Sequence, residues 1–404
     1  FTRVKTDNLS FLGERLIRGR HKIHPYPAML HPLLVDYLLS QYSSNEKIVF
    51  DPFCGSGVTL LQSSLYGCNS IGFDINPLAL LIAKTKTRTF NIFQLNKEYT
   101  ELRHAIEESE ITDVPDINNI QYWYSSDVIE DLGRIRHIIK NAQFEYRDFF
   151  ITCFAYVCRN QSLTRNGEFK RYRMSEDRLE LFQNQVFKRF YTHIESNIKE
   201  FSLDTFKAIP KIYLQNSEDS FRKNIKYDLV ITSPPYGDSR TTVAYGQYSS
   251  FGSDWVQDLT EFHNVNYRVD NESLGKKRIV NQEIFNNDIL VTTYKKIKKQ
   301  DYKRADDVIN FFNGYFNSLK NIERNLNSRG TICLVVGNRT VKGITIPMDQ
   351  ITSKFLLNLG LNFEGIFIRD ITNKVMPLRN SPTNLTGKKS KTMANEYIVV
   401  FQKQ

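Results

Sequence analysis

A serine, two prolines and a tyrosine follow directly after an apolar run in DLVITSPPYG, residues 228–237. Proline has no N–H to donate to a sheet ladder, so the strand must end at this point. The two prolines, Pro234 and Pro235, also fix φ and stiffen the loop. The Ser233 hydroxyl, the Pro234 carbonyl and the Tyr236 ring are therefore held in set directions. Two hydrogen-bond acceptors beside a planar ring suit a nucleobase that carries an exocyclic amino group.

Chemistry on such an amino group needs no covalent nucleophile. Ser233 and the Pro234 carbonyl would accept the amino hydrogens, which draws the nitrogen lone pair out of conjugation and towards a methyl donor. Tyr236 would stack on the base, which contributes about 1–3 kcal/mol. A PPY stretch on its own also fits a rigid surface turn, but a second motif on the same sheet favours the nucleobase site.

The second motif is a glycine turn in KIVFDPFCGSG, residues 47–57, where an apolar strand is followed by Asp51. Gly55 and Gly57 permit positive φ and a close approach of the backbone to a ligand. Asp74 ends the next strand, in NSIGFDIN. An acidic side chain in that place can accept hydrogen bonds from both ribose hydroxyls of a nucleoside.

A cationic ligand suits this turn better than a pyrophosphate does. A dinucleotide-binding turn would have a third glycine at position 60, where this chain has Leu60. Asp51 also adds negative charge where a pyrophosphate would lie. The sulfonium and ammonium groups of S-adenosylmethionine match this acidic end, so we predict that cofactor. An ordinary glycine turn between a strand and a helix is the alternative.

Both motifs need a parallel, doubly wound sheet to position them. Strand, turn, helix, strand and helix follow one another from residue 48 to residue 87, with a glycine stop at Gly67 and Pro77 in the first turn of the second helix. The sequence therefore predicts an α/β fold of the Rossmann-like type. Further strands are predicted at 211–214, 227–232, 330–338, 363–371 and 396–403, and a helix at 307–326.

Two segments interrupt this pattern. Residues 90–201 are polar and mostly helical in spacing, and residues 241–301 are basic and irregular. We predict a cofactor-binding half at 1–89, a mainly helical insertion at 90–205 that is a candidate for target recognition, and a catalytic half at 206–404. The basic segment of the catalytic half is the competing place for target recognition.

Composition favours a polyanionic partner. The 404 residues carry a net charge of +10. The five scattered cysteines show no zinc-ligand spacing, which is typical of reduced thiols in the cytoplasm. No apolar stretch is long enough to span a bilayer, so we expect no membrane association. No second His, Cys or carboxylate cluster joins His24, so we expect no metal site.

Three motifs together carry a family resemblance. DPFCGSG, FDIN and TSPPYG resemble the class I S-adenosylmethionine-dependent DNA amino-methyltransferases, and HPYPAML at 24–30 resembles the family motif that closes over the methionine end of the cofactor. The resemblance covers about half of the chain: residues 21–89, 206–245 and the late strands. It implies a mostly parallel seven-stranded methyltransferase sheet.

The resemblance also assigns roles to residues. Asn216 lies where the family usually has an acidic or polar contact to the adenine of the cofactor. The implied catalytic residues are Ser233, Pro234, Pro235 and Tyr236. The implied cofactor-binding residues are His24, Pro25, Tyr26, Pro27, Asp51, Phe53, Gly55, Ser56, Gly57, Asp74, Ile75 and Asn216.

The residue before PPY bears on the base that is methylated. In the family a serine there leans towards N4 of cytosine, and aspartate or asparagine leans towards N6 of adenine. Ser233 therefore favours cytosine N4. Methylation at carbon 5 would need a Pro-Cys nucleophile, and none of the twelve prolines is followed by cysteine.

A base inside a duplex must be flipped out, at a cost of a few kcal/mol, roughly. Basic segments can offset that cost through phosphate contacts, although a run of charges is often only a solvated face. The predicted nucleic-acid contacts are Arg165, Lys170, Arg171, Arg173, Arg240, Lys295 and Lys296. We expect a monomer that acts on double-stranded DNA in a restriction-modification system, with a cognate restriction endonuclease as a further partner.

Three alternatives stay open at this point. One is an adenine-N6 DNA methyltransferase, and another is an amino-methyltransferase of structured RNA such as tRNA. RNA enzymes of this kind usually read DPPYG and often have an N-terminal RNA-binding domain, whereas only about 45 residues precede the glycine turn here. The third is a methyltransferase-like subunit that binds DNA without catalysis.

Overall fold

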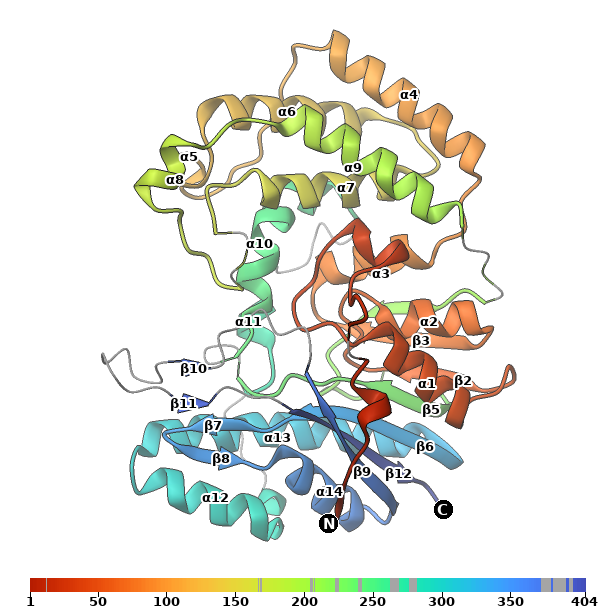
Figure 1. Ribbon diagram of the computed structural model, residues 1–404, viewed down its shortest axis with the longest axis vertical. Helices are drawn as coiled ribbons and strands as arrows, with labels where there is room; N and C mark the ends of the chain where they lie inside the picture. Colours follow the sequence, from red (N-terminus) through yellow and green to blue (C-terminus); the bar gives the residue numbers. More distant parts are fainter. Residues whose placement is uncertain are drawn as a thin grey trace.

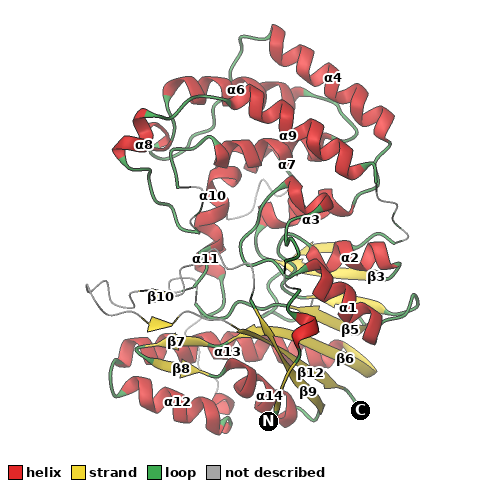
Figure 2. Cartoon of the chain, in the orientation of Figure 1, coloured by secondary structure: helices red, strands yellow, loops and turns green. Residues whose placement is uncertain are grey.

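The computed structural model describes residues 1–11, 13–165, 167, 169–203, 206, 208–221, 225–238, 242–261, 269–275, 282–371, 379–380, 390–391 and 395–404. A sheet with flanking helices forms one half of the molecule, and a lobe of helices forms the other half (Figure 1). In Figure 2 the strands of the sheet gather below the helical lobe.

The central sheet has eight strands in the order β1-β9-β12-β6-β5-β2-β3-β4. Their bounds are β1 (Arg3–Lys5), β2 (Ile48–Asp51), β3 (Asn69–Asp74), β4 (Lys211–Leu214), β5 (Tyr227–Thr232), β6 (Leu326–Gly337), β9 (Asn362–Asp370) and β12 (Asn395–Gln402). Only β12 runs antiparallel to its neighbours in this sheet. The sheet is thus mostly parallel, as the sequence predicts.

One strand more than predicted lies at the edge of the sheet. β1 pairs in parallel with β9, and its three residues are all exposed. Because an edge strand of this length has no apolar alternation, the sequence gives no signal for it. The central strands do give one, since parallel strands covered on both faces read as continuous apolar runs.

Helices cover both faces of the sheet. Their bounds are α1 (Pro32–Tyr42), α2 (Val58–Tyr66), α3 (Pro77–Thr87), α10 (Tyr245–Val256), α11 (Val269–Glu272), α12 (Asp288–Lys298), α13 (Tyr302–Asn325) and α14 (Met348–Asn358). Short elements are η1 (Asp7–Leu9), η2 (Gly19–Ile23), η3 (Gln257–Leu259), η4 (Gln282–Asn286), β7 (Arg339–Val341), β8 (Ile344–Ile346), β10 (Arg379–Asn380) and β11 (Ser390–Lys391). One apolar cluster lies between the sheet and α13 and α14, and another lies between the opposite face and α1.

The helical lobe has a core of its own. Its helices are α4 (Ile92–Glu108), α5 (Ile120–Trp123), α6 (Ser126–Asn141), α7 (Arg147–Asn160), α8 (Glu176–Glu180) and α9 (Val186–Phe201). Phe149, Phe154 and Phe190 are fully buried in it, and Trp255 of α10 joins them. The helical spacing of residues 90–201 is thus confirmed as helical structure.

The expectation of an irregular segment at 241–301 is wrong for much of its length, because it contains α10 and α12. α10 has two glycines and three serines, so local propensity is poor, and packing against α7 makes it helical. α12 carries Leu290, Thr293 and Ile297 on one buried face, a helical spacing that the many lysines obscure.

α10 connects the two halves. It begins beside the ends of the central strands and ends in the helical lobe (Figure 1). At its lobe end the Arg136 Nε donates a hydrogen bond of 3.0 Å to the Trp255 carbonyl. Near its pocket end the Arg159 guanidinium lies 3.7 Å from the centre of the Tyr248 ring. These buried contacts fix the position of the lobe relative to the sheet.

The glycine turn of the sheet edge gives a first prediction. Gly57 has φ of +79°, and a Cβ there would meet the Ala83 Cβ at 2.7 Å. Gly343, between β7 and β8, has φ of +76° but nothing within 4 Å. Gly343→Ala should cost about 1–2 kcal/mol for the left-handed backbone alone. Gly57→Ala should cost clearly more, because α3 must also move.

Thermal unfolding of the ligand-free protein and both variants measures this difference. Equal losses of thermal stability in Gly57→Ala and Gly343→Ala would show that the close packing of the turn on α3 adds nothing to the cost of the Gly57→Ala substitution.

Candidate active site

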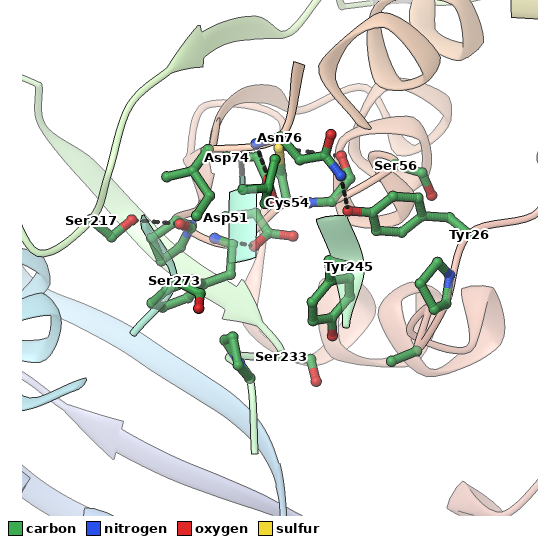
Figure 3. A pocket seen from close by; sticks show the side chains of 18 of the residues that line it. Tyr26, Asp51, Cys54, Ser56, Asp74, Asn76, Ser217, Ser233, Tyr245 and Ser273 are labelled. Atoms are coloured by element: carbon green, nitrogen blue, oxygen red, sulfur yellow. Dashed lines mark hydrogen bonds between the residues drawn. The ribbon is translucent and has the colours of Figure 1, made fainter. Parts of the chain in front are cut away.

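A pocket of about 910 Å³, counted with its open mouth, lies where β2, β3 and β5 end. Figure 3 shows Asp51 and Asp74 within it, Tyr26 and Tyr245 on one side, Ser217 on the other, and Ser233 below. The predicted site residues that line it are Tyr26, Pro27, Asp51, Phe53, Gly55, Ser56, Asp74, Ile75, Asn216, Ser233 and Pro235. The glycine turn and the SPPY loop thus open into the same pocket.

Asp51 connects the two motifs. The Thr232 Oγ1 donates a 2.6 Å hydrogen bond to Asp51 Oδ1, and the Phe53 N–H donates to the same oxygen at 3.1 Å. Thr232 is the last residue of β5, directly before Ser233. The strand that presents the SPPY loop is therefore hydrogen-bonded to the end of the strand that presents the glycine turn.

Asp74 holds the glycine turn in place from the next strand. Its Oδ2 accepts a 2.8 Å hydrogen bond from the Gly55 N–H, and its Oδ1 accepts one of 2.8 Å from the Asn76 N–H. The sequence predicts ribose contacts for this side chain, and the structure adds backbone bonds that fix its orientation. Each carboxylate oxygen has a second lone pair, so acceptor capacity towards a ligand remains.

The ionised forms of Asp51 and Asp74 are disfavoured when the pocket holds no cationic ligand. Burial raises the pKa of Asp51 to about 6, against hydrogen bonds from Thr232, Thr59 and Phe53 that lower it. Burial likewise raises the pKa of Asp74 to about 6. A positive charge or hydrogen-bond donors in the pocket would stabilise the ionised forms.

An aromatic wall closes one side of the pocket. The Tyr26 and Tyr245 rings stack with centroids 5.8 Å apart. The Asn76 Nδ2 donates to Tyr26 Oη at 2.9 Å and to Ser249 Oγ at 2.7 Å. A Cβ at Gly55 would lie 3.2 Å from the Tyr26 ring, so the glycine allows this close approach.

Sequence reasoning missed Tyr245 and Asn76. Tyr245 begins α10, which lies in a segment expected to be irregular, so no local signal could find it. Asn76 precedes Pro77 in DINP and caps α3 through the Leu78 N–H, which is a recognisable pattern for a helix start. The start of α10 is also capped, since the Gly246 and Gln247 N–H groups each donate to Asp270 at 3.0 Å.

Some predicted cofactor residues do not line the pocket: His24, Pro25 and Gly57. The His24 Nδ1 lies 2.7 Å from the Pro25 carbonyl, and burial lowers the His24 pKa to about 3. The Tyr248 Oη donates to the same Pro25 carbonyl at 3.1 Å. These residues support the pocket wall from behind, and Gly57 does so by its close packing on Ala83.

The residues of the SPPY loop differ in position: two line the pocket, and two pack towards the protein interior. Ser233 and Pro235 line the pocket, whereas Pro234 is buried and Tyr236 packs partly against the apolar cluster beneath. The Tyr236 Oη is 3.0 Å from Ser233 Oγ and donates a 3.0 Å hydrogen bond to Glu396. Tyr236 is not among the residues that line the pocket, and its stacking on a base stays a prediction.

Asn216 lines the opposite side, but its amide is already engaged. Its Oδ1 accepts from the Glu218 N–H at 3.0 Å, and its Nδ2 donates to the Glu272 carbonyl at 3.4 Å. Its neighbour Ser217 donates to the Pro52 carbonyl at 2.5 Å. The contact of Asn216 with adenine therefore stays a prediction.

A buried lysine lies behind the glycine turn. Lys86 is fully buried, and its Nζ donates to Ser56 Oγ at 3.1 Å and lies 3.4 Å from His21 Nδ1. Burial lowers the Lys86 pKa to about 7. The sequence KTKT gives no sign of this, because it reads as the solvated end of a helix.

The basic hairpin, meaning the described residues of 164–173 with the antiparallel bridge between Thr164 and Arg173, lies along α10. The Arg171 guanidinium lies 4.7 Å from the Trp123 ring centre and 4.5 Å from that of Phe251, and Arg173 lies 4.4 Å from that of Tyr122. The Phe169 ring faces Tyr248 with centroids 6.5 Å apart. Because α10 begins at Tyr245 in the pocket wall, this hairpin is adjacent to the active site.

The other predicted nucleic-acid contacts lie partly on the basic hairpin and partly away from the pocket. Arg165 is exposed on the same hairpin, and Lys170 precedes Arg171 there. Lys295 and Lys296 are exposed on α12, which lies beyond the sheet from the helical lobe (Figure 1). Arg240 lies outside the described residues.

Within the described ranges, no group of three His, Cys, Asp or Glu side chains could hold a metal ion. No helix of the same ranges is long and apolar enough to cross a membrane. The five cysteines are all buried and free.

Comparison with known proteins matches the same regions. A family described as DNA methylase matches residues 10–85 and 227–404, more than half of the chain. The Type II methyltransferase M.MvaI of Kocuria varians is 33% identical over 424 residues, covering 98% of this chain and 93% of that protein. The Type II methyltransferase M.BsoBI of Geobacillus stearothermophilus is 22% identical, covering 92% and 83%.

Among solved structures, a SAM-dependent methyltransferase from Methanosarcina mazei covers 94% of this chain and 98% of its own, at 9% identity and a TM-score of 0.33. A likeness this low does not bear on function. The sheet, the pocket and the full-length relative together define an amino-methyltransferase that uses S-adenosylmethionine. The chain belongs to the DNA methylase family.

The pocket fits this methyl donor. Two buried carboxylates with no ion-pair partner among the described residues suit a ligand with a sulfonium, an ammonium and ribose hydroxyls. The glycine at position 55 leaves the Tyr26 ring open to the pocket, which gives a flat apolar surface beside the acidic groups.

The raised pKa of Asp51 gives a second prediction. An aspartate ionises at 3.8 in the unfolded chain and at about 6 here, so it destabilises the ligand-free fold above pH 6 and not below 3.8. The difference is on the order of 3 kcal/mol. Asp51→Asn keeps the oxygen that accepts from Thr232 and Phe53, so its melting temperature relative to wild type should rise as pH goes from 4 to 7.

Melting curves across this pH range test the prediction, with Asp288→Asn at the exposed start of α12 as the control. The prediction fails if Asp51→Asn loses the same stability at pH 4 and pH 7. S-adenosylmethionine binding should be lost in Asp51→Asn at either pH.

Proposed function

We propose that this protein transfers a methyl group from S-adenosylmethionine to the N4 atom of cytosine in double-stranded DNA. One observation carries the choice of base. The residue of the SPPY loop that reaches the pocket with a polar side chain is a serine, Ser233, and it lies in the pocket that contains Asp51 and Asp74. In the family, a serine at this position leans towards cytosine N4.

The residues that line the pocket have different proposed roles. Asp51 and Asp74 bind the cationic and hydroxyl groups of the cofactor, which supplies an electrophilic methyl group when bound. Tyr26 and Tyr245 form the flat wall that orients it. Ser233 accepts a hydrogen bond from the cytosine amino group, which directs the nitrogen lone pair away from the ring and towards the methyl group.

The helical lobe and its basic hairpin are the proposed DNA-contacting surface. Arg171 and Arg173 stack on aromatic rings, which pre-organises the guanidinium groups for phosphate or base-edge contacts. The hairpin follows α10 away from the pocket wall, so DNA on the lobe would present a flipped base to Ser233. This placement favours the segment 90–201 over the segment 241–301 for target recognition.

Both full-length relatives are named as type II methyltransferases. We therefore place this protein in a type II restriction-modification system, where methylation protects a short DNA site from a cognate endonuclease. A monomer is sufficient for this activity, because the described residues of one chain form the pocket.

Methyl transfer with product identification tests the proposed function. Labelled S-adenosylmethionine is supplied with unmethylated duplex DNA and, in parallel, with bulk tRNA, and the modified nucleoside is identified by mass. N4-methylcytosine from DNA is the expected product. N6-methyladenine would overturn the choice of base, and label in tRNA alone would overturn the choice of nucleic acid. Binding of DNA without any transfer would favour a non-catalytic subunit.

The basic hairpin gives a further prediction. Arg173→Gln should weaken DNA binding at low salt and reduce the slope of log affinity against log salt by about 1, because one phosphate contact is lost. Lys295→Gln on α12 is the matched control and should change neither quantity. Fluorescence anisotropy with a duplex at several salt concentrations measures both. A larger effect from Lys295→Gln would move the DNA surface to the α12 side of the sheet.

A further inference from the structure

Hydrogen-bonded side chains connect the SPPY loop to β12, and an ion pair continues this row to β9. The Ser233 Oγ lies 3.0 Å from Tyr236 Oη, and Tyr236 Oη lies 3.0 Å from Glu396 Oε1. The second Glu396 oxygen, Oε2, lies 3.5 Å from Arg369 Nε. Glu396 itself does not line the pocket, so it can reach a bound base only through Tyr236 and Ser233.

The sheet holds the far end of this row in a fixed register. Glu396 is on β12, the antiparallel strand, directly opposite Gly337 of β6 and Arg369 of β9. Its side chain is 19% exposed, and that of Arg369 is 6% exposed. The glycine opposite Glu396 has no side chain to compete for this space. The carboxylate is therefore sheltered and faces a positive charge.

The chemistry of these groups sets the direction of every hydrogen bond in the row. An ionised carboxylate can only accept, so the hydrogen between Tyr236 and Glu396 comes from the phenol. The phenol keeps that hydrogen, because burial and then the Glu396 charge raise the pKa of Tyr236 well above its usual value. The phenolic oxygen can then only accept from Ser233, so the serine hydrogen points away from the pocket.

This direction matters for the reaction. A substrate amino group donates N–H, and its lone pair must stay available to the methyl group. A serine that donated its hydrogen to that nitrogen would compete with the methyl group for the lone pair. A serine whose hydrogen is held by Tyr236 presents only its lone pairs to the amino group.

We propose that Glu396 is a positioning residue that acts through Tyr236 to keep the Ser233 hydroxyl as an acceptor for the substrate amino group. The proposal rests on the proposed amino-methyltransferase function and adds a residue to it from outside the glycine turn and the SPPY loop. It holds for cytosine N4 and adenine N6 alike, because both are amino groups. Arg369 keeps the carboxylate in place as its ion-pair partner.

Glu396→Gln is the informative variant, because it keeps the shape and removes the charge. An amide can donate as well as accept, so the hydrogen bond between Glu396→Gln and Tyr236, and then the one between Tyr236 and Ser233, can reverse direction. The turnover number for DNA methylation should fall about 10- to 100-fold, the range for losing a hydrogen bond to a charged group. The KM values for S-adenosylmethionine and DNA should stay close to those of the wild type, whereas the melting temperature should fall, because the buried Arg369 loses its ion-pair partner.

A double-mutant cycle with Tyr236→Phe separates positioning from a merely structural role. Tyr236→Phe removes the link, so adding Glu396→Gln to it should lower turnover no further. Glu364→Gln, a glutamate on the exposed face of β9, is the matched control and should have wild-type turnover. Independent, multiplicative losses from Glu396→Gln and Tyr236→Phe would overturn the proposal, as would a Glu396→Gln variant with full turnover.

The outcomes also separate this inference from the proposed function. A wild type that methylates DNA, with independent losses in the cycle, overturns the role of Glu396 alone. A wild type that makes N6-methyladenine overturns the choice of base and leaves the cycle as the test of Glu396. A wild type that transfers no methyl group to DNA overturns both.

Discussion

The hydrogen bond from Thr232 to Asp51 joins the two halves of the active site. Thr232 ends the strand that presents Ser233, and Asp51 ends the neighbouring strand that presents the glycine turn. Because parallel strands end at the same edge, the glycine turn and Ser233, which are the proposed cofactor and base sites, open into one pocket. Its cost is a buried carboxylate with a raised pKa, which is tolerated at a site that binds a cation.

A DNA base must also reach this edge of the sheet. α10 connects the edge to the helical lobe, which is the proposed DNA-contacting surface. The helix begins with Tyr245 in the pocket wall and ends with Trp255 in the core of the helical lobe. The basic hairpin packs along it through Phe169 and Arg171. The lobe is therefore placed by the same element that closes the pocket, so the proposed DNA-contacting surface and the pocket are held by one helix.

Local patterns in the sequence were sufficient for much of this. The glycine turn, the SPPY loop and the buried strands are encoded by neighbouring residues, and the structure places Asp51, Asp74 and Ser233 in one pocket. Features that depend on contacts distant in sequence could not be predicted. Glu396 is 160 residues from Tyr236, and α10 is helical because of α7 and not because of its own composition.

Two further features have local causes that burial alone reveals. The Tyr236 hydroxyl donates to a carboxylate beneath the loop, and its ring packs partly against the core. The sequence KTKT does not show that the Lys86 end of the helix is covered by η2 and the glycine turn. In both cases a polar group is engaged by a partner that only the fold supplies.

The central claim is that the buried carboxylates at the strand ends receive a cationic cofactor, and the pH dependence of binding tests it most directly. Calorimetric titration of S-adenosylmethionine into the protein between pH 5 and pH 7.5 gives the affinity and the protons released. Ionised Asp51 and Asp74 are required, and their pKa values are about 6 in the free protein. Affinity should therefore rise with pH, by about 10-fold between pH 5 and pH 7 for each carboxylate, with proton release that is largest below pH 6 and disappears above it. An affinity that is constant or falls over this range would contradict the account.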